Sequence, residues 1–250
     1  MENKKSFSWV TALIIGLSIV ASCTVLAIGL SRFRSESVHT IAATGSASVD
    51  FESDIIIWRG SFSAQDYTSK AAYDKIKNDA AVVRKYLLDN GIDENEIVFN
   101  SVSIWKTYRD IYDEHGNYVG REQDGYSLSQ SVDVSSSDID KVEKISRDIS
   151  SLLESGVEFE SQNPEYYYTG LDDLKLALIE QATANSRERI DIMAANSGAK
   201  LGKLRNSNLG VFQITATNSG TSSYSYDGAF DTSSRHKTAS ITVKLEYDLK

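Results

Sequence analysis

The sequence predicts an α+β protein in which a mixed or antiparallel sheet is covered by about three helices and preceded by one N-terminal transmembrane helix. Three observations support this class. Residues 10–30 form an uncharged apolar run, three later segments repeat apolar residues at helical spacing, and several others alternate apolar and polar residues as strands do. Helices that each expose one apolar stripe must cover a sheet, which places the chain in this class.

The apolar run reads VTALIIGLSIVASCTVLAIGL and forms a helix about 31 Å long, close to the thickness of a bilayer core. We expect an uncleaved signal anchor, because a cleavable signal peptide has a shorter apolar core. Two alternatives stay open. The sequence VASC, which ends at Cys23, resembles a bacterial lipobox whose cysteine would be lipidated, and the run could also be an ordinary cleaved signal.

Charge suggests how the chain is oriented. Four basic residues and Glu2 give residues 1–34 a charge of +3, which leaves −12 for the rest of this −9 chain. The short end with Lys4 and Lys5 is expected in the cytoplasm, so residues 1–34 form a cytoplasmic stub and membrane anchor. Residues 35–250 are then extracytoplasmic, which means periplasmic in a diderm bacterium. So acidic a domain is a poor candidate for nucleic-acid binding.

The first half of the exported part predicts strands, one helix and a hairpin. Strand patterns begin at residues 40–41 and continue over 53–64, and residues 97–106 form another strand. A helix capped by Thr68 or Ser69 carries one apolar stripe: Ala72, Ile76, Ala80, Val83 and Leu87. Residues 107–125 are polar with interspersed tyrosines and have a turn signal at His115-Gly116-Asn117, so they predict a projecting hairpin.

The second half predicts two more helices and three strands. A helix capped by Ser136 or Ser137 has the stripe Ile139, Val142, Ile145, Ile149 and Leu152. A short strand at 157–160 and a turn at Asn163-Pro164 follow. The longest helix, 172–196, has the stripe Leu174, Leu178, Ala182, Ser186, Ile190 and Met193. Strands at 204–217 and 238–249 flank a loop, 218–236, that is rich in Ser, Tyr and Gly and is expected to be flexible.

Gly91, Gly156 and Gly198 each follow the last apolar position of a predicted helix. Glycine can take the left-handed conformation that ends a helix, so these three are expected to be structural joints. A glycine loop that binds phosphate would have a strand before it and a helix after it, which is the reverse order.

The motif search predicts no enzyme. G-x-S-x-G, H-E-x-x-H and C-x-x-C patterns are absent, there is one cysteine, and the three histidines are far apart. No catalytic residue, metal ligand or cofactor site is therefore expected. Four hairpin tyrosines form a possible interaction surface: Tyr108, Tyr112, Tyr118 and Tyr126. Ordinary strand packing is the alternative, as is a ligand or glycan shelf at Tyr166–Tyr168 or at Tyr224 and Tyr226.

Two segments resemble the SIMPL-domain family. ATGSASVDFESDIIIWRGSFSA, residues 43–64, is similar to its opening strands, and RERIDIMAANSGAKLGKLRNSNLG, residues 187–210, is similar to its helix-to-strand segment. The resemblance covers roughly residues 40–249. It implies a non-enzymatic α+β domain exported to the periplasm or cell envelope, with members linked to stress tolerance and others similar to parts of ring-like assemblies. The long anchor and the Ser/Tyr loop depart from the common family pattern.

Together these features lead us to expect a membrane-anchored scaffold that forms homo-oligomers through the 107–125 hairpin and has a role in stress. The alternative is a small-molecule or glycan binding module that uses the tyrosine-rich loops.

Overall fold

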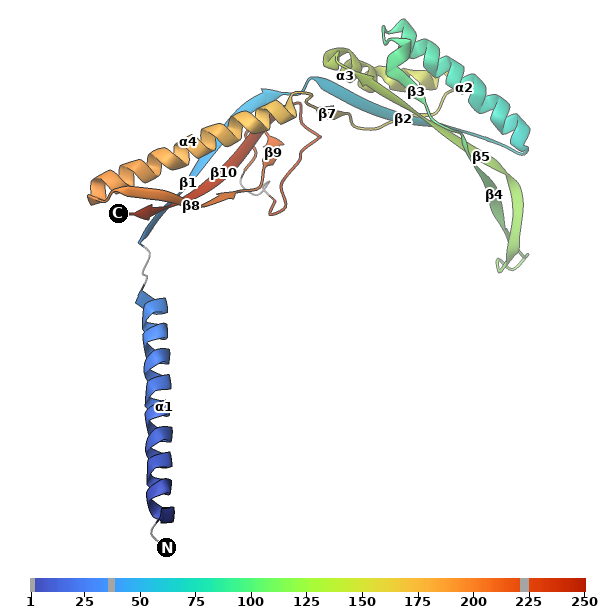
Figure 1. Cartoon of the computed structure of the whole chain (residues 1–250). Coiled ribbons are helices and arrows are strands. Elements are labelled where there is room, and N and C mark those ends of the chain that lie inside the picture. Colours follow the sequence, from blue (N-terminus) through green and yellow to red (C-terminus); the bar gives the residue numbers. More distant parts are fainter. Residues whose placement is uncertain (1–2, 36–38, 221–224) are drawn as a thin grey trace. The chain divides into compact units, whose positions relative to one another are not determined.

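The structure, a computed structural model, describes residues 3–35, 39–220 and 225–250 (Figure 1). The chain divides into two compact units. The larger comprises residues 46–185 and 209–243, and the smaller comprises residues 1–45, 186–208 and 244–250. The α+β class is confirmed. The strands form two sheets, of six and four strands, rather than one common layer.

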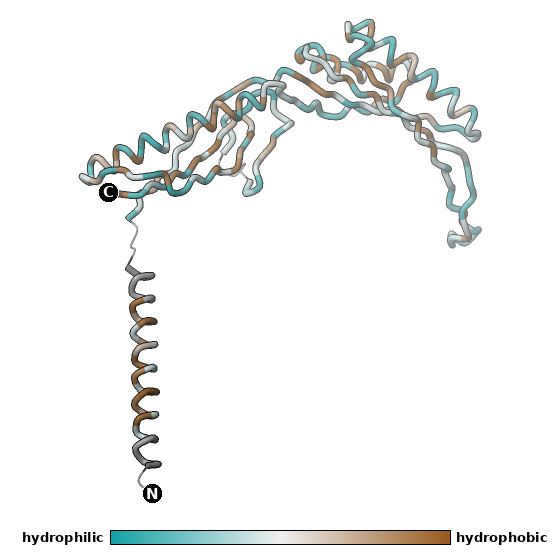
Figure 2. Tube along the Cα trace, in the orientation of Figure 1, coloured by the Kyte–Doolittle hydropathy of each residue, from teal (hydrophilic) through white to brown (hydrophobic). Residues whose placement is uncertain are grey.

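Helix α1 runs over Asn3–Ser35 and is longer than the predicted 10–30. No proline interrupts the flanking segments, so helical hydrogen bonding continues through them. Within α1, residues Trp9–Ile28 are long and apolar enough to cross a membrane, and a signal sequence would meet the same criteria. Their apolar side chains are exposed, and Cys23 is an exposed free cysteine. Figure 2 shows the run of hydrophobic residues along this helix.

The six-stranded sheet is built around one long antiparallel pair. Strands β2 (Ile55–Asp66) and β5 (Tyr118–Ser136) pair continuously from Ile56 opposite Ser136 to Asp66 opposite Tyr126. Two strands pair with β5, namely β3 (Ile97–Phe99) and β4 (Ser103–Tyr112), and two pair with β2, namely β6 (Phe159–Ser161) and β7 (Glu165–Tyr167).

The segment predicted as one strand over 97–106 is two strands, β3 and β4. The residues between them leave the ladder at Asn100, whose side-chain amide donates to Ser131 Oγ at 3.0 Å and to Asp133 Oδ2 at 3.1 Å. Its backbone N–H donates to the Ser131 carbonyl at 2.9 Å. The side chain of Asn100 therefore competes with regular pairing, as asparagine commonly does.

Helices α2 (Ser69–Asp89) and α3 (Ile139–Asp148) cover one face of this sheet, and the 3₁₀-helix η2 (Ile149–Ser155) continues α3 (Figure 1). The predicted stripes are confirmed, since all their members except the half-buried Ala80 are buried. The strand pattern is confirmed too, with Ile56, Trp58, Phe62 and Ala64 buried on the same side. These residues form one hydrophobic core.

A glycine makes room for an aromatic ring in this core. Phe159 of β6 lies against Trp58 and Phe62 of β2, with ring centroids 5.7 and 6.2 Å apart. A Cβ on Gly60, which lies between them in β2, would be 2.2 Å from the Phe159 ring. Gly60 therefore lets the ring cover the strand backbone, as aromatic residues do over strand glycines.

The helix caps were partly predicted. Thr68 is the N-cap of α2, and its Oγ1 accepts from the Ala71 N–H at 3.2 Å, as predicted. The cap of α3 is Asp138 instead of Ser136 or Ser137, because its carboxylate accepts from the Lys141 N–H at 3.2 Å and pairs with Lys141 Nζ at 2.8 Å. Ser136 Oγ accepts from the Asp138 N–H and supports that cap.

The three helix-ending glycines share one geometry. Their φ angles are +83° at Gly91, +79° at Gly156 and +73° at Gly198. In each case the next residue donates its N–H to a carbonyl five positions earlier: Ile92 to Leu87, Val157 to Leu152 and Ala199 to Ala194, all at 3.1 Å. This is the left-handed ending in which the chain reverses onto the last helical turn. The strands β3, β6 and β8 (Leu201–Leu209) follow these three turns.

The four-stranded sheet has the order β1-β10-β8, with β9 also paired to β10. Its remaining strands are β1 (Thr40–Glu52), β9 (Gln213–Ala216) and β10 (His236–Leu249). The predicted strand 204–217 is therefore wrong as a single element, since β8 ends at Leu209 and β9 begins at Gln213. The break lies at Gly210, whose N–H donates to the Thr242 carbonyl at 2.8 Å and where a Cβ would lie 2.3 Å from Thr242 Oγ1.

Helix α4 (Leu171–Ser197) lies along this sheet (Figure 1). Its predicted stripe is buried from Leu178 to Ile190, but Met193 is exposed and Ala194 is buried in its place. The period of 3.6 residues accounts for the shift by one position. Ser186 is in the buried stripe because its Oγ donates to the Ala43 carbonyl at 2.9 Å. The predicted alternation along β10 is confirmed for Ala239, Ile241, Val243 and Leu245, which are all buried, and its last member, Tyr247, is half-buried.

Candidate functional site

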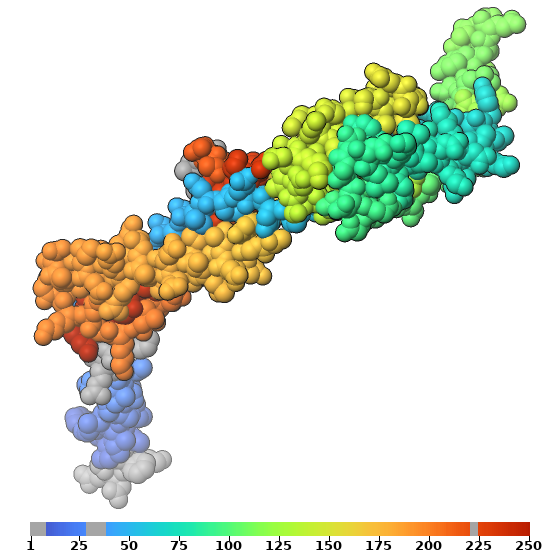
Figure 3. All heavy atoms as spheres, turned by 90° about the horizontal axis from the view of Figure 1, so that it is seen from above, coloured from blue at the N-terminus to red at the C-terminus, as the bar shows by residue number. Residues whose placement is uncertain are grey.

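The predicted hairpin extends beyond the six-stranded sheet. Strands β4 and β5 stay paired out to Tyr112 opposite Tyr118, whereas the last β2 partner of β5 is Asp66, opposite Tyr126. Among the residues that the structure describes, 107–125 therefore form a two-stranded ribbon that no third strand joins. Figure 3 shows this ribbon as a narrow projection of the larger unit. Both of its faces and its edges are open to contact.

Local interactions hold the ribbon together. Arg109 pairs across the strands with Glu122 at 3.4 Å, and Arg121 pairs with Asp110 at 2.9 Å. At the turn, Asp113 accepts hydrogen bonds from the N–H groups of His115 and Asn117, at 2.9 and 2.8 Å. These bonds, with one from the Asn117 side chain, lower the pKa of Asp113. Exposed ion pairs contribute little each, so the ribbon depends on its ladder and its turn.

Three of the four predicted tyrosines are presented to solvent. Tyr108, Tyr112 and Tyr118 are 54%, 60% and 57% exposed, and the last two meet edge to face with centroids 6.1 Å apart. Tyr126 is placed differently, because it packs against the hydrophobic core at the base of the ribbon. The possible interaction surface therefore consists of the first three tyrosines.

Four apolar neighbours on the same strands were not among the predicted contact residues. Ile104, Trp105, Ile111 and Val119 are also exposed. The alternating pattern around them is typical of any strand. It therefore could not predict that no other layer covers these side chains. Successive residues of a strand point to opposite faces, so these four and the three tyrosines are spread over both faces of the strands. Exposed aromatic and aliphatic side chains are typical of contact sites.

The whole described fold from β1 to β10 corresponds to one protein family. The model of the SIMPL family, described as a protein of unknown function (DUF541), matches residues 41–247. The chain belongs to the SIMPL family. No curated protein matches it. The SIMPL domain thus includes both sheets and the ribbon, and α1 precedes it.

The SIMPL domain packs its tyrosine run, Tyr166–Tyr168, inside the larger unit. These rings, with Phe51, Phe230 and neighbouring side chains, surround a cavity of about 10 Å³, which is too small for a ligand larger than one water. Tyr168 contacts Phe51 with centroids 5.0 Å apart. Of the two later tyrosines, Tyr226 is 94% exposed, and Tyr224 lies outside the described residues. Tyr166 also lines an open hollow of about 390 Å³, so a ligand shelf at this end of the run stays a prediction.

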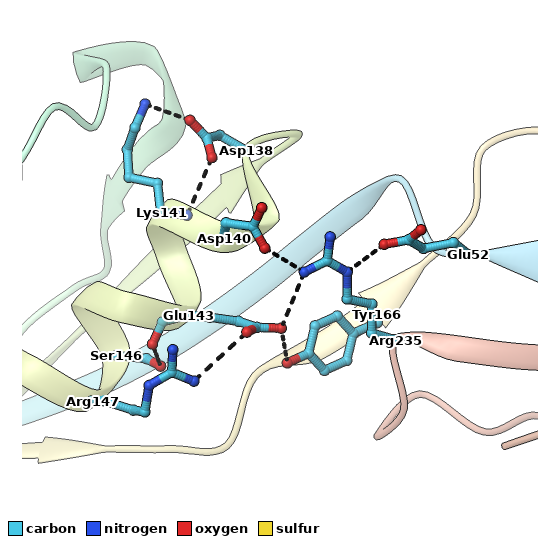
Figure 4. Close-up of polar contacts among 9 residues, drawn as sticks. All are labelled: Glu52, Asp138, Asp140, Lys141, Glu143, Ser146, Arg147, Tyr166 and Arg235. Atoms are coloured by element: carbon cyan, nitrogen blue, oxygen red, sulfur yellow. Dashed lines mark hydrogen bonds and ion pairs between the residues drawn. The ribbon is translucent and has the colours of Figure 1, made fainter. Parts of the chain in front are cut away.

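A network of charges surrounds Tyr166 (Figure 4). Arg235, just before β10, donates to Glu52 of β1 at 2.6 Å and also pairs with Asp140 and Glu143 of α3. The Tyr166 hydroxyl donates to Glu143 at 2.9 Å. The hydrogen bonds from Arg235 to Asp140 and, next in size, to Glu52 raise the pKa of Arg235. The network joins α3, β1, β7 and the start of β10 within the larger unit.

Lys237 lies two residues further along and is fully buried. Its ammonium group donates to the Tyr166 carbonyl at 2.8 Å, and burial lowers its pKa, an effect that the charge of Asp231 partly offsets. Buried lysines with a lowered pKa occur at reactive sites, but here the side chain is enclosed by packed rings. In the described ranges no three His, Cys, Asp or Glu side chains come together as a metal site.

Tyr166 is expected to titrate at unusually high pH. Burial and the hydrogen bond to Glu143 raise its pKa from 10 to about 12. A group whose folded pKa is raised stabilises the fold fully below its unfolded pKa, so this contribution is lost as pH rises from about 10 through about 12, by at most about 3 kcal/mol.

The measurement is tyrosinate absorbance after a rapid pH jump, compared between the unmodified chain and Tyr166→Phe. The difference should titrate with a midpoint of about 12. Tyr226→Phe, which removes an exposed phenol, serves as the control. A Tyr166 difference curve that coincides with the Tyr226 curve would contradict this prediction.

Proposed function

We propose that this SIMPL-domain protein is a non-enzymatic, membrane-anchored scaffold that acts outside the cytoplasm through protein contacts. Its principal contact element is the ribbon, through which copies of the chain associate. The observation that carries the proposal is a ribbon that has only two strands in the described part of the chain and exposes Tyr108, Tyr112 and Tyr118, with the exposed Trp105 beside its base. Tyrosine and tryptophan bury a large area at a small cost in side-chain entropy, and they dominate binding energy at interfaces.

The ribbon chemistry favours contact with another copy over contact with nucleic acid. Its ion pairs balance its basic residues, Arg109 and Arg121, with acidic neighbours, and the domain as a whole is acidic. Nucleic-acid binding needs a basic footprint, which this surface lacks. An antiparallel ribbon with alternating aromatic residues can pack against the same ribbon of a second copy, since identical surfaces form two-fold interfaces.

The test is the mass of the full chain in detergent, measured by light scattering after size-exclusion chromatography. In the main variant, residues 110–121 are replaced by Asn-Gly, which connects the paired residues Arg109 and Glu122 by a two-residue turn. We expect this variant to shift toward smaller species. The double substitution Tyr112→Ser and Tyr118→Ser should weaken association by about tenfold or more.

A matched control uses exposed tyrosines elsewhere. Tyr73→Ser and Tyr226→Ser remove two exposed rings outside the ribbon and should leave the mass unchanged. All variants keep α1, so any association through that helix is common to them. The proposal fails if the unmodified chain is a monomer at about 100 µM, a concentration at which even weak specific pairs form. It also fails if the shortened ribbon associates as the full chain does.

The proposed topology rests on α1 and its flanking charges. Two basic residues flank each end of the span, Lys4 and Lys5 before it and Arg32 and Arg34 after it, and we assign the shorter end with the two lysines to the cytoplasm. Protease added outside an intact cytoplasmic membrane, with any outer barrier opened, should then degrade residues 35–250 while a cytoplasmic marker survives. Degradation only after lysis of the cytoplasmic membrane would place the domain inside instead.

A further inference from the structure

A hollow of about 330 Å³ lies at the base of the ribbon, inside the larger unit. Five of its lining residues carry the argument. Three are tyrosines, Tyr67, Tyr108 and Tyr126, and two are carboxylates, Asp66 and Asp124. They come from the end of β2 and from both strands of the ribbon.

A β-bulge positions one of these carboxylates. Thr107 pairs with Gly125 and Tyr108 pairs with Gln123, so Asp124 is an extra residue without a partner in β4. Bulges of this kind change the direction of a side chain and are common beside functional sites. The next residue, Gly125, allows β5 to pass against the end of β2, because a Cβ there would lie 2.7 Å from the Asp66 carbonyl oxygen. This close approach brings Asp66 and Asp124 to the same hollow.

The negative charge of the hollow is not compensated. Asp66 accepts one hydrogen bond, from the Thr68 N–H at 3.3 Å, and forms no ion pair within the described ranges. Asp124 has neither a hydrogen bond nor an ion pair to any residue that the structure describes, and no Lys, Arg or His lines the hollow. Lys106, opposite Tyr126 on β4, is likewise outside the lining. Two carboxylates therefore lack a cation at this place.

The tyrosine rings complete the chemistry of a cation site. Tyr67 is 84% exposed and Tyr108 is 54% exposed, so both rings are accessible beside the carboxylates. Aromatic faces attract ammonium and guanidinium groups, and carboxylates accept their hydrogen bonds. A neutral sugar could stack on the same rings, but it would leave both negative charges unpaired. The uncompensated charge therefore favours a cation.

We propose that this hollow binds an organic cation through a primary ammonium or guanidinium group. Two sources present such a group, a free polyamine and a basic side chain of a peptide. The site goes beyond the proposed scaffold function, since all its residues belong to one copy of the chain and lie outside residues 110–121. The ribbon variant with Asn-Gly in place of 110–121 should therefore keep the binding even where it loses self-association.

The test is isothermal titration calorimetry on the full chain in a neutral detergent. The probes are spermidine, a short oligolysine peptide, glucose and magnesium chloride. We expect saturable heat with spermidine or the peptide, and the stronger of the two identifies the source. Asp124→Asn should weaken binding about tenfold or more, because it removes one of two charges that contact the cation. Asp124 forms no hydrogen bond in the described part of the chain, so this variant is expected to fold, which circular dichroism checks.

The matched control is Glu122→Gln, which removes an acidic side chain from the same strand outside the hollow. It should weaken binding clearly less than Asp124→Asn does, since Glu122 does not line the hollow and water screens its exposed charge. Equal loss in Glu122→Gln and Asp124→Asn would overturn the site in favour of general electrostatic attraction. Equal competition by magnesium, no heat with either cation, or binding of glucose alone would also overturn it.

Discussion

Replacing Trp58 by alanine is expected to destabilise the domain by about 3–5 kcal/mol, the cost of removing a large buried aromatic side chain. Trp58 is fully buried at the centre of the six-stranded sheet, where its ring contacts Phe159. Its indole N–H also donates to Ser161 Oγ at 3.0 Å, and Ser161 donates in turn to the Ser146 carbonyl at 2.8 Å. The substitution therefore opens a cavity and weakens the connection between β2, β6 and α3.

The measurement is urea unfolding of the full chain in detergent, followed by far-ultraviolet circular dichroism. Trp58→Phe is the matched variant, because it keeps an aromatic ring and loses the indole hydrogen bond. It should cost about 1–2 kcal/mol, which separates ring volume from hydrogen bonding. Trp105→Ala, which removes an exposed tryptophan from β4 beside the base of the ribbon, should cost less than about 1 kcal/mol. A Trp58→Ala cost no larger than that of Trp105→Ala would contradict the assigned core.

Replacing Arg235 by alanine is expected to cost about 2 kcal/mol, because a network of several ion pairs contributes more than one isolated surface pair. Three carboxylates, Glu52, Asp140 and Glu143, would lose their shared cation, although Arg147 would still lie 3.6 Å from Glu143. Most of the loss comes from Glu52 and Glu143, because Asp140 is largely exposed and water screens it. Repulsion among the remaining carboxylates adds to the loss.

Urea unfolding of two further variants, and of Arg235→Ala at high salt, tests whether Arg235 stabilises the domain through this charge network. Arg235→Lys keeps the charge but loses the planar fork that bonds to two carboxylates at once, so it should be intermediate. Arg205→Ala, which breaks the single exposed pair with Asp248 at 3.4 Å, should cost less than about 1 kcal/mol. The Arg235→Ala cost should shrink in about 1 M NaCl. A cost that is independent of salt and equal to that of Arg205→Ala would refute the network.

Local sequence patterns predicted part of the ribbon. Its turn at His115-Gly116-Asn117 and its exposed Tyr108, Tyr112 and Tyr118 agree with what the sequence predicts. The role of Tyr126 was not predictable, because it depends on where β2 ends. That strand stops at Asp66, directly opposite Tyr126, so this ring still contacts the core while the next ones do not.

Other parts of the candidate sites carried no local signal. The charge network gathers Glu52, Asp140, Glu143 and Arg235, which lie far apart in the chain and come together only in the fold. The hollow at the base of the ribbon depends on a one-residue bulge at Asp124, and a bulge is a mismatch between two strands. Neither the charge network nor the hollow can be predicted from the sequence of any single segment.

Local sequence patterns were enough to predict the apolar span of α1, the stripes of α2 and α3, the alternation of β10 and the glycines that end the helices. Each of these depends on residues within a few positions of one another, where spacing and backbone conformation settle the outcome. Only the tertiary structure decided that the strands divide into two sheets, that residues 97–106 and 204–217 each break into two strands, and that Asp66 and Asp124 lie together. Those outcomes depend on which strands pair and in what register, and pairing energy comes from residues far apart in the chain.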